Sequence, residues 1–361
     1  MKLALIGFGQ AGGKIVDKFL WYDEQTGNDI VRSAAAVNTA KADLLGLDYV
    51  PEENRVLIGQ SRVKGHGVGA DNELGAEIAE GDIDEIQGTL DNVPVHEVDA
   101  FLIVAALGGG TGSGGAPALA REMNRVYDIP IYTLGILPGR DEGAIYQANA
   151  GRSLKTVARE ADAAILIDND AWRTSNETVE EGFDNINQQI AQRVGLMFAS
   201  GEVVDGVAES VVDSSEIINT LRDGGIASLG YASAGAAPDA SENINTITSI
   251  TRKALLTGMS LPDAVDAEAG LLVVAGAPER ISRKGVERAR KWVEEETGSL
   301  QVRGGDFPLE SDRLAALVLL GGVERSERVQ QFLERARDAH EEAEEVDPRE
   351  QFGNEEIDDL F

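Results

Sequence analysis

One segment constrains the fold of this chain more than any other: residues 108–115, which read GGGTGSGG. It lies between an apolar stretch, Phe101–Ala106, that predicts a buried strand and a stretch whose apolar spacing predicts a helix. Glycine lets a backbone approach a phosphate closely and point several N–H groups at it, and a helix N-terminus adds partial positive charge. A simple turn does not require this density of glycine, so we interpret the segment as a phosphate-binding loop. The candidate contacts are Gly108, Gly109, Gly110, Thr111, Gly112 and Ser113, of which the threonine and the serine add hydroxyl donors.

Two further glycine-rich loops also precede predicted helices. The first follows an apolar strand at Lys2–Gly7, and its candidate contacts are Gly9, Gln10, Ala11 and Gly12, with Lys14 as a further nucleotide contact. The second spans Gly65–Asp71, and its candidate contacts are Gly67, Val68, Gly69 and Ala70. Because ligands of open parallel sheets bind at the carboxyl ends of the strands, we expect all three loops to meet at one edge.

The first loop by itself also fits another kind of nucleotide site. Its spacing, Gly7-x-Gly9-x-x-Gly12, matches the dinucleotide fingerprint, which leaves an NAD-dependent oxidoreductase as an alternative. That fold needs an acid at the end of the second strand to hold the ribose, and this chain has Asn38 and Thr39 there. The P-loop of other NTPases is excluded, because Phe8 and Ile15 replace its first glycine and its Ser/Thr.

Strands and helices alternate along the first half of the chain, which predicts an α/β fold with a parallel sheet covered by helices on both faces. A long helical segment follows at about Ser175–Met197, and a second, smaller α/β unit comes after it. We therefore divide the chain into a nucleotide-binding domain (1–173), a central helix (174–200), a C-terminal domain (201–323) and a charged helix with an acidic tail (324–361). The end of this tail, Glu341–Phe361, is predicted to be disordered.

The charge of the chain limits its partners. It carries 63 Asp and Glu against 32 Lys and Arg, a net charge of −31, which disfavours a nucleic-acid groove because such a groove needs a basic patch. We interpret this excess as adaptation to high salt, where screening removes self-repulsion, and an ordinary acidic protein is the alternative. There are no cysteines, the three histidines lack metal-ligand spacing, and no apolar run approaches the ~20 residues that span a bilayer. We expect a soluble, cytoplasmic protein without a transmembrane segment or a protein-held metal site.

Residues 108–114, GGGTGSG, resemble the signature of the tubulin/FtsZ superfamily, and the resemblance extends from Lys2 to about Gly322. It implies binding of GTP and GDP, with Mg²⁺ held mainly by phosphates and water, and head-to-tail polymerisation with GTP hydrolysis. Gly9–Gly12 is similar to the first phosphate loop of tubulin, and Gly65–Asp71 to the γ-phosphate loop of FtsZ. Asn38 lies in a stretch that resembles the second loop of the family.

The resemblance also implies residues that hold the nucleoside. Glu142 matches the FtsZ acid that binds ribose, and Asn169 lies at the end of the strand that begins the base pocket. Phe183 and Asn187 match the residues that stack on guanine and hydrogen-bond to it. From the residues alone, Phe183 on an apolar helical stripe fits a core position, and Glu142 fits an acid stabilised by a helix N-terminus.

Hydrolysis needs a group that orients the attacking water. Residues 211–216 resemble the acidic loop of FtsZ, with Asp213 and Glu216 in the places of its two acids, and in that family the loop enters the nucleotide pocket of the next subunit. From the spacing alone, the same pair fits a helix N-cap with a capping-box acid. The catalytic interpretation therefore depends on the resemblance.

Within the superfamily this chain combines features of both branches. Tyr146 and Ala40 depart from FtsZ, while Ser113 and Asn187 follow tubulin, a mixture similar to the CetZ group of archaeal tubulin relatives associated with cell shape. A divergent FtsZ-type division GTPase and a GTP-binding regulator that does not polymerise are the alternatives. The last residues, Asn354–Phe361, suit a short docking peptide for a protein partner, and a solvated acidic tail is the equal alternative.

Overall fold

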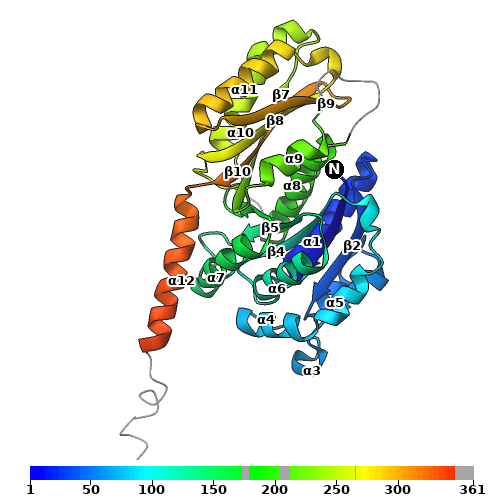
Figure 1. The fold of residues 1–361 in the computed structure, drawn as a ribbon, viewed down its shortest axis with the longest axis vertical. Helices are drawn as coiled ribbons and strands as arrows, with labels where there is room; N and C mark the ends of the chain where they lie inside the picture. Colours follow the sequence, from blue (N-terminus) through cyan, green and yellow to red (C-terminus); the bar gives the residue numbers. More distant parts are fainter. Residues whose placement is uncertain (173–178, 203–211, 265, 346–361) are drawn as a thin grey trace, which may run out of the picture.

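The computed structural model describes residues 1–172, 179–202, 212–264 and 266–345, and Figure 1 shows their arrangement. Within these residues one sheet has the strand order β3-β2-β1-β4-β5-β6-β7-β10-β8-β9. The strands are β1 (Leu3–Phe8), β2 (Val31–Asn38), β3 (Arg55–Leu57), β4 (Ala100–Ala106), β5 (Ile131–Leu137), β6 (Ala163–Asp168), β7 (Ile226–Gly235), β8 (Ala267–Gly276), β9 (Gln301–Pro308) and β10 (Arg313–Val323). The helices are α1 (Gly9–Thr26), α2 (Lys41–Leu45), α3 (Gln60–Val63), α4 (Asn72–Gly81), α5 (Ile83–Leu90), α6 (Thr111–Val126), α7 (Ala144–Glu160), α8 (Val179–Ser200), α9 (Ser214–Leu221), α10 (Ile244–Thr257), α11 (Arg283–Thr297) and α12 (Glu327–Glu345).

The first six strands of this order, β3, β2, β1, β4, β5 and β6, are parallel and carry helices on both faces, as the sequence predicts. Side chains alternate between the faces, so Leu3 and Leu5 of β1 pack in the core that includes α1 and α8. Ala4 and Ile6 instead pack in the core that includes α4, α5 and α6. Burial on both sides explains why these strands are continuous apolar runs.

The second α/β unit is not a separate sheet. Strand β7 pairs in parallel with β6 over only two positions, Ala164 with Ile226 and Ile165 with Ala227. Strand β10 is antiparallel to both β7 and β8, and β9 is parallel to β8. This short pairing joins the two halves into one ten-stranded order, which the sequence did not predict because pairing between distant strands leaves no local signal.

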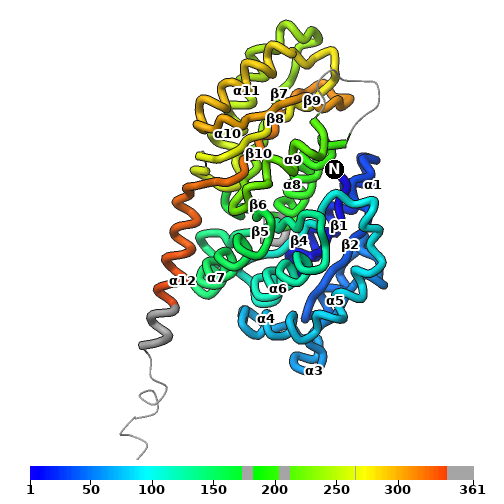
Figure 2. Tube along the Cα trace, in the orientation of Figure 1, coloured from blue at the N-terminus to red at the C-terminus, as the bar shows by residue number. Residues whose placement is uncertain are grey.

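Helix α12 leaves the end of β10 and runs beside α7, as Figure 2 shows. The two backbones are close: a Cβ added to Gly151 of α7 would lie 2.1 Å from the carbonyl oxygen of Phe332. The helix continues to Glu345, so the prediction of disorder from Glu341 was wrong for residues 341–345, where Glu and Ala favour helix. The rest of the predicted tail, 346–361, and the predicted helical residues 175–178 lie outside the described residues.

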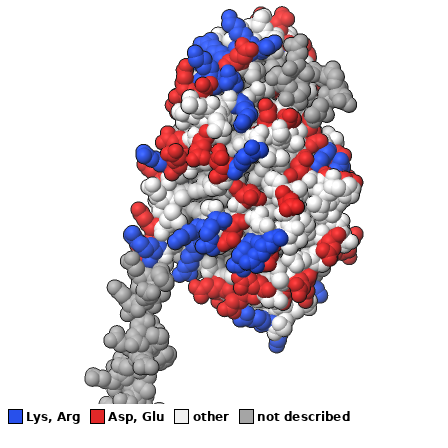
Figure 3. Space-filling model, in the orientation of Figure 1, with Lys and Arg blue, Asp and Glu red and all other residues white. Residues whose placement is uncertain are grey.

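Acidic side chains are spread over the visible face rather than gathered in one patch (Figure 3), as expected for a net charge of −31. Across the residues that the structure describes, no helix is long and apolar enough to cross a membrane.

Candidate functional site

The three predicted glycine loops meet at one edge of the sheet. The loop after β1 touches the loop after β4: Gly9 has a φ of +75°, and a Cβ there would lie 2.9 Å from the backbone nitrogen of Gly112. A Cβ at Gly12 would lie 2.1 Å from the carbonyl oxygen of Val104. These positions accept only glycine, because real Cβ atoms do not approach backbone atoms so closely.

The loop before α4 packs on the same region. Gly65, Gly67 and Gly69 all have positive φ, which L side chains rarely adopt. A Cβ at Gly110 would lie 2.4 Å from the carbonyl oxygen of Gly69, so these loops are also in backbone contact. Val68 is buried between them, and Ala70 precedes the helix-capping Asp71.

Gly109 differs from the other glycines of residues 108–115. A Cβ there would meet nothing within 4 Å, whereas a Cβ at Gly108 would already lie 3.1 Å from a backbone oxygen. Gly109 therefore borders open space at the N-terminus of α6, where the backbone N–H groups of a helix start are available to an anion.

Hydroxyl and amide side chains hold the loops in place. The Oγ1 atoms of Thr39 and Thr111 are 2.7 Å apart and buried. The hydroxyl of Ser113 donates to the carbonyl oxygen of Gly109, so it bonds its own loop in this structure. Asn38 donates from Nδ2 to Asp43 (3.0 Å) and accepts at Oδ1 from the backbone N–H of Ala40 (3.1 Å), which orients its amide.

Asn149 of α7 is a loop-supporting residue that the sequence did not reveal. Its side chain is fully buried, and Nδ2 donates to the carbonyl oxygens of Ala70 (2.7 Å) and Gly108 (3.2 Å). One amide therefore bridges the loop before α4 and the loop after β4. A polar residue on a helix that is buried against a sheet was the available signal, but helix spacing does not say what such a residue contacts.

The nucleoside candidates Glu142 and Asn169 lie together, at the turns that follow β5 and β6. Glu142 Oε1 accepts from the backbone N–H of Gly139 (2.7 Å) and from Nδ2 of Asn169 (3.3 Å). Glu142 is half-buried just before the start of α7, and Asn169 is buried. The two turns are therefore joined by the same carboxylate.

Phe183 and Asn187 lie one turn apart on α8. Phe183 is 39% exposed, although Ile186 and Ile190 of the same helix are buried, so it is not a core residue. Asn187 is half-buried. The ion pair between Asp184 and Lys18 (2.8 Å) fixes this end of α8 against α1. In α1 itself, Gln10 and Lys14 are exposed and Ala11 is half-buried.

The predicted acid pair forms a helix cap. Asp213 is exposed and caps α9, with Oδ1 accepting from the backbone N–H of Glu216 (3.1 Å) and from the Ser215 hydroxyl. The hydrogen bond from Ser215 lowers the pKa of Asp213. Burial, followed by repulsion from Asp213, raises the pKa of Glu216. The local geometry is thus the cap that the spacing indicates, with two carboxyls at one helix start and their pKa values pushed apart.

The acid pair and the glycine loops lie at opposite edges of the sheet, in the sense that the pair is at the amino ends of the parallel strands and the loops are at their carboxyl ends. A Cβ at Gly201 would lie 3.3 Å from both the backbone nitrogen of Met1 and the Cα of Ser214, so the start of α9 is beside the start of the chain. Figure 1 shows the N-terminus next to α9. Strand β1 then runs through six residues to the first glycine loop, roughly 20 Å at ~3.3 Å per residue. Asp213 and the glycine loops of one chain therefore do not share a site.

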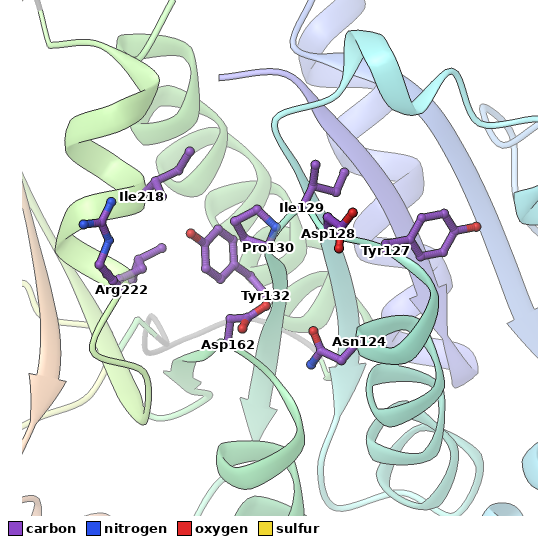
Figure 4. A pocket seen from close by; sticks show the side chains of 10 residues that line it. Asn124, Tyr127, Asp128, Ile129, Pro130, Tyr132, Asp162, Ile218 and Arg222 are labelled. Atoms are coloured by element: carbon purple, nitrogen blue, oxygen red, sulfur yellow. The ribbon is translucent and has the colours of Figure 1, made fainter.

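A cavity of about 310 Å³ opens at the same edge as the acid pair. Figure 4 shows Ile218 of α9 and Arg222, which follows that helix, on one side, with Tyr132 of β5 and Pro130, which precedes that strand, opposite them. Burial raises the pKa of Tyr132 well above its usual range, so its hydroxyl stays neutral. The amino edge of the sheet is thus hollowed beside α9.

The comparisons with known proteins cover both halves of the chain. A family described as "Tubulin/FtsZ family, GTPase domain" matches residues 2–177, and one described as "Tubulin-like CetZ, C-terminal domain" matches residues 176–338. Tubulin-like protein CetZ2 of Haloferax volcanii is 62% identical over 100% of both chains. The solved GTPγS-bound protofilament of CetZ2 from that organism has a TM-score of 0.90, covering 95% of this chain and 100% of that one. The GDP-bound monomer of its CetZ1 is 57% identical with a TM-score of 0.88, covering 94% and 100%.

Proposed function

This chain belongs to the CetZ family of tubulin-like proteins, and we propose that it binds GTP, assembles head to tail with copies of itself and hydrolyses GTP where two subunits meet. One observation carries the proposal: the glycine loops and the Asp213–Glu216 pair lie at opposite edges of one sheet. Stacking copies in one direction brings the acid edge of each subunit against the glycine edge of the next. Such a heterologous contact does not close on itself and generates a filament.

GTP binds along the carboxyl edge in this proposal. The backbone N–H groups of the three loops bind the phosphates. The phosphates lie beside Gly109, which borders open space at the start of α6. The carboxylate of Glu142 receives the ribose hydroxyls, and Asn169, Phe183 and Asn187 hold the base. The GTPγS-bound and GDP-bound states of the relatives support this choice of ligand.

Mg²⁺ accompanies the phosphates. Across the described residues no group of three or more His, Cys, Asp or Glu side chains could hold a metal ion. The hydroxyls of Thr39 and Thr111 are engaged with each other. This donor set fits an ion bound mainly by phosphate oxygens and water, which is how Mg²⁺ commonly binds, and the ion would neutralise charge on the β- and γ-phosphates.

Hydrolysis needs the second subunit. Asp213 is exposed and ionised, and it is positioned by its cap hydrogen bonds before any contact forms. In a head-to-tail pair, Asp213 and Glu216 of one copy enter the phosphate pocket of the other and orient or deprotonate the attacking water. A positioned acid or base of this kind contributes roughly 10²–10⁴-fold in rate.

The filament has a role in cell shape within this proposal, and the protein works in the cytoplasm at high salt. The relatives from Haloferax volcanii agree with the interpretation of the −31 charge as a high-salt adaptation. We propose the division that the sequence predicts: a GTP-binding unit (1–173), a central segment (174–200) whose described part is α8, and a unit that activates hydrolysis (201–323). A division role and a non-polymerising regulator are the competing functions.

The test mixes two inactive proteins. Gly109→Trp places a large side chain where the phosphates would bind, at a position where an added Cβ meets nothing within 4 Å, and it leaves Asp213 intact. Asp213→Ser leaves the pocket intact and can still cap α9. Where the two variants meet in the mixture, one type of contact joins the intact pocket of the Asp213→Ser protein to the intact acid pair of the Gly109→Trp protein. The mixture should therefore hydrolyse GTP, although neither protein does so alone. The rescued rate should rise more steeply than linearly with protein concentration.

Gly88→Trp is the matched control, because a Cβ at Gly88 would also meet nothing within 4 Å and Gly88 lies on α5, which contains neither the glycine loops nor the acid pair. Gly88→Trp should hydrolyse GTP by itself, without being mixed with a second variant. Absence of rescue at every ratio, with both proteins folded and the Asp213 variant binding GTP, would rule out a site shared between subunits and leave only nucleotide binding.

A further inference from the structure

A buried arginine connects the C-terminal helix to the nucleoside side of the site. Arg328 lies in the first turn of α12 and its side chain is 2% exposed. Its Nε donates to Asp168 Oδ2 (2.9 Å), and its Nη2 donates to the carbonyl oxygen of Pro138 (2.8 Å). Nη2 also lies 3.8 Å from Asp170. One guanidinium thus contacts two turns that are about thirty residues apart in sequence.

These turns are the ones that carry Glu142 and Asn169. Pro138 is followed by Gly139, whose backbone N–H binds Glu142 at 2.7 Å. Asp168 is followed by Asn169, whose amide also binds Glu142. A second link runs between the turns, from the backbone N–H of Arg140 to Asp170 (2.8 Å). Arg328 donates hydrogen bonds to both turns, to Pro138 in the turn after β5 and to Asp168 at the start of the turn after β6.

We propose that Arg328 is a positioning residue for nucleoside recognition, through which α12 sets the separation of the turn after β5 from the turn after β6. The inference rests on the proposed function, because it assumes that Glu142 receives the ribose. The phosphate loops have hydrogen bonds of their own, from Thr39, Thr111 and Asn149, although Gly108 lies beside Pro138 of this network. Loss of Arg328 should therefore weaken ribose recognition and spare phosphate binding.

The geometry explains why arginine is needed. A guanidinium is planar and presents several N–H groups in a fixed fork, so it can bond a carboxylate and a carbonyl at once. Lysine is a single point of charge and cannot hold both turns in the same way. The guanidinium also lies over the ring of Phe332 at 4.3 Å, and Phe332 packs on α7 at Gly151. This packing fixes Arg328 relative to the body of the protein.

The test compares GDP with 2′,3′-dideoxy-GDP, binding of each being measured by calorimetry. A charged hydrogen bond to the ribose should make the unaltered chain bind GDP about ten- to a hundredfold more tightly than the dideoxy ligand. Arg328→Lys should bring this ratio close to one, while affinity for the dideoxy ligand changes little. A merely structural loss would weaken both ligands equally. The exposed Arg335 of the same helix gives the control, Arg335→Gln, which should keep the full ratio.

Asp170→Asn provides a second variant that keeps the Arg328–Asp168 pair and weakens the contacts of Asp170 with the backbone N–H of Arg140 (2.8 Å) and with Arg328 (3.8 Å), so it should give an intermediate ratio. If Arg328→Lys does not fold, a full ratio in Asp170→Asn overturns the inference. A full ratio in folded Arg328→Lys overturns it as well, and leaves the ribose role of Glu142 standing. If the unaltered chain does not distinguish the two ligands, the proposed role of Glu142 fails and the inference fails with it.

Discussion

Thr39 and Thr111 are joined by a buried hydrogen bond of 2.7 Å between their hydroxyls, although 72 residues separate them. Thr39 follows β2 and Thr111 begins α6 after β4, so the bond crosses the end of β1, which lies between these strands. Thr39 also accepts at its carbonyl oxygen from the backbone N–H of Gly67 (3.1 Å). This residue therefore connects the loop after β4 with the loop before α4.

Replacing Thr39 by valine should weaken GTP binding. Valine keeps the shape but removes the hydroxyl, and an unsatisfied buried hydroxyl at Thr111 costs about 1–3 kcal/mol. We expect the free energy of unfolding to fall by about this amount, and GTP affinity to fall because the two loops are no longer joined. Thr39→Ser keeps the hydroxyl and should bind almost normally. Equal affinity for Thr39→Val and the unaltered chain, measured by calorimetry, would contradict a role for this bond.

Removing the Asp213 carboxylate should abolish most hydrolysis and leave GTP affinity unchanged, because the residue lies at the edge opposite to the glycine loops. Asp213→Ala also removes the cap of α9 and should lower the free energy of unfolding by about 1 kcal/mol. Asp213→Ser retains a capping oxygen, so it should regain that stability without regaining turnover. A serine variant that hydrolyses GTP normally would show that only the cap matters.

Hydrolysis should fall on the acid side of neutrality because of Glu216. Burial and Asp213 raise the pKa of Glu216, so its proton is retained at a higher pH than the ordinary ~4.3 of a glutamate. The carboxylate that hydrolysis requires is then lost as the pH falls through this raised value. GTP binding, measured in parallel, should not follow the same curve.

The same shift predicts the stability of Glu216→Gln. A carboxyl with a raised folded pKa destabilises the fold above its unfolded pKa, because ionisation is disfavoured in the folded state. The neutral glutamine removes this penalty. Glu216→Gln should therefore be at least as stable as the unaltered chain at pH 7, in urea denaturation, while its hydrolysis is low at every pH. A clearly less stable variant would mean that the carboxylate supports the fold.

Two glycines of the signature loop should respond differently to alanine. A Cβ at Gly114 would lie 2.1 Å from the carbonyl oxygen of Asn72, a backbone atom that cannot move without displacing α4. Gly114→Ala should lower the free energy of unfolding by about 1–3 kcal/mol. Gly109→Ala should leave thermal stability unchanged and reduce GTP affinity, since its methyl group enters the open space. Loss of stability in both variants would indicate that Gly109 is packed.

Deleting Gly353–Phe361 should leave GTP hydrolysis unchanged and disturb localisation in cells, if these residues dock a protein partner. The apolar residues of the segment, Ile357, Leu360 and Phe361, would share one face of a helix. Their replacement by serine in the full chain should reproduce the defect, whereas neutralising Glu355 and Glu356 should not. Normal localisation of the truncated protein would discard the docking peptide.

The sequence by itself determined what depends on neighbouring residues. Glycine density at 108–115, the alternation of apolar strands with helices, and the cap spacing from Asp213 to Glu216 are local patterns, and the structure has the elements that they predict. Local patterns work here because φ preferences, capping and side-chain periodicity act over a few residues. The family resemblance at residues 108–114 added the expectation that the bound nucleotide is GTP or GDP.

Tertiary structure alone decided how those elements relate in space. The bond between Thr39 and Thr111, the amide of Asn149 across two loops and the contact of Arg328 with Asp168 join residues far apart in the chain. The acid pair is separated from the glycine loops because α9 packs beside Met1 and β1, roughly 20 Å long, runs from there to the first loop. No local pattern encodes these relationships, because they arise only when the strands pair and their helices pack on both faces of the sheet.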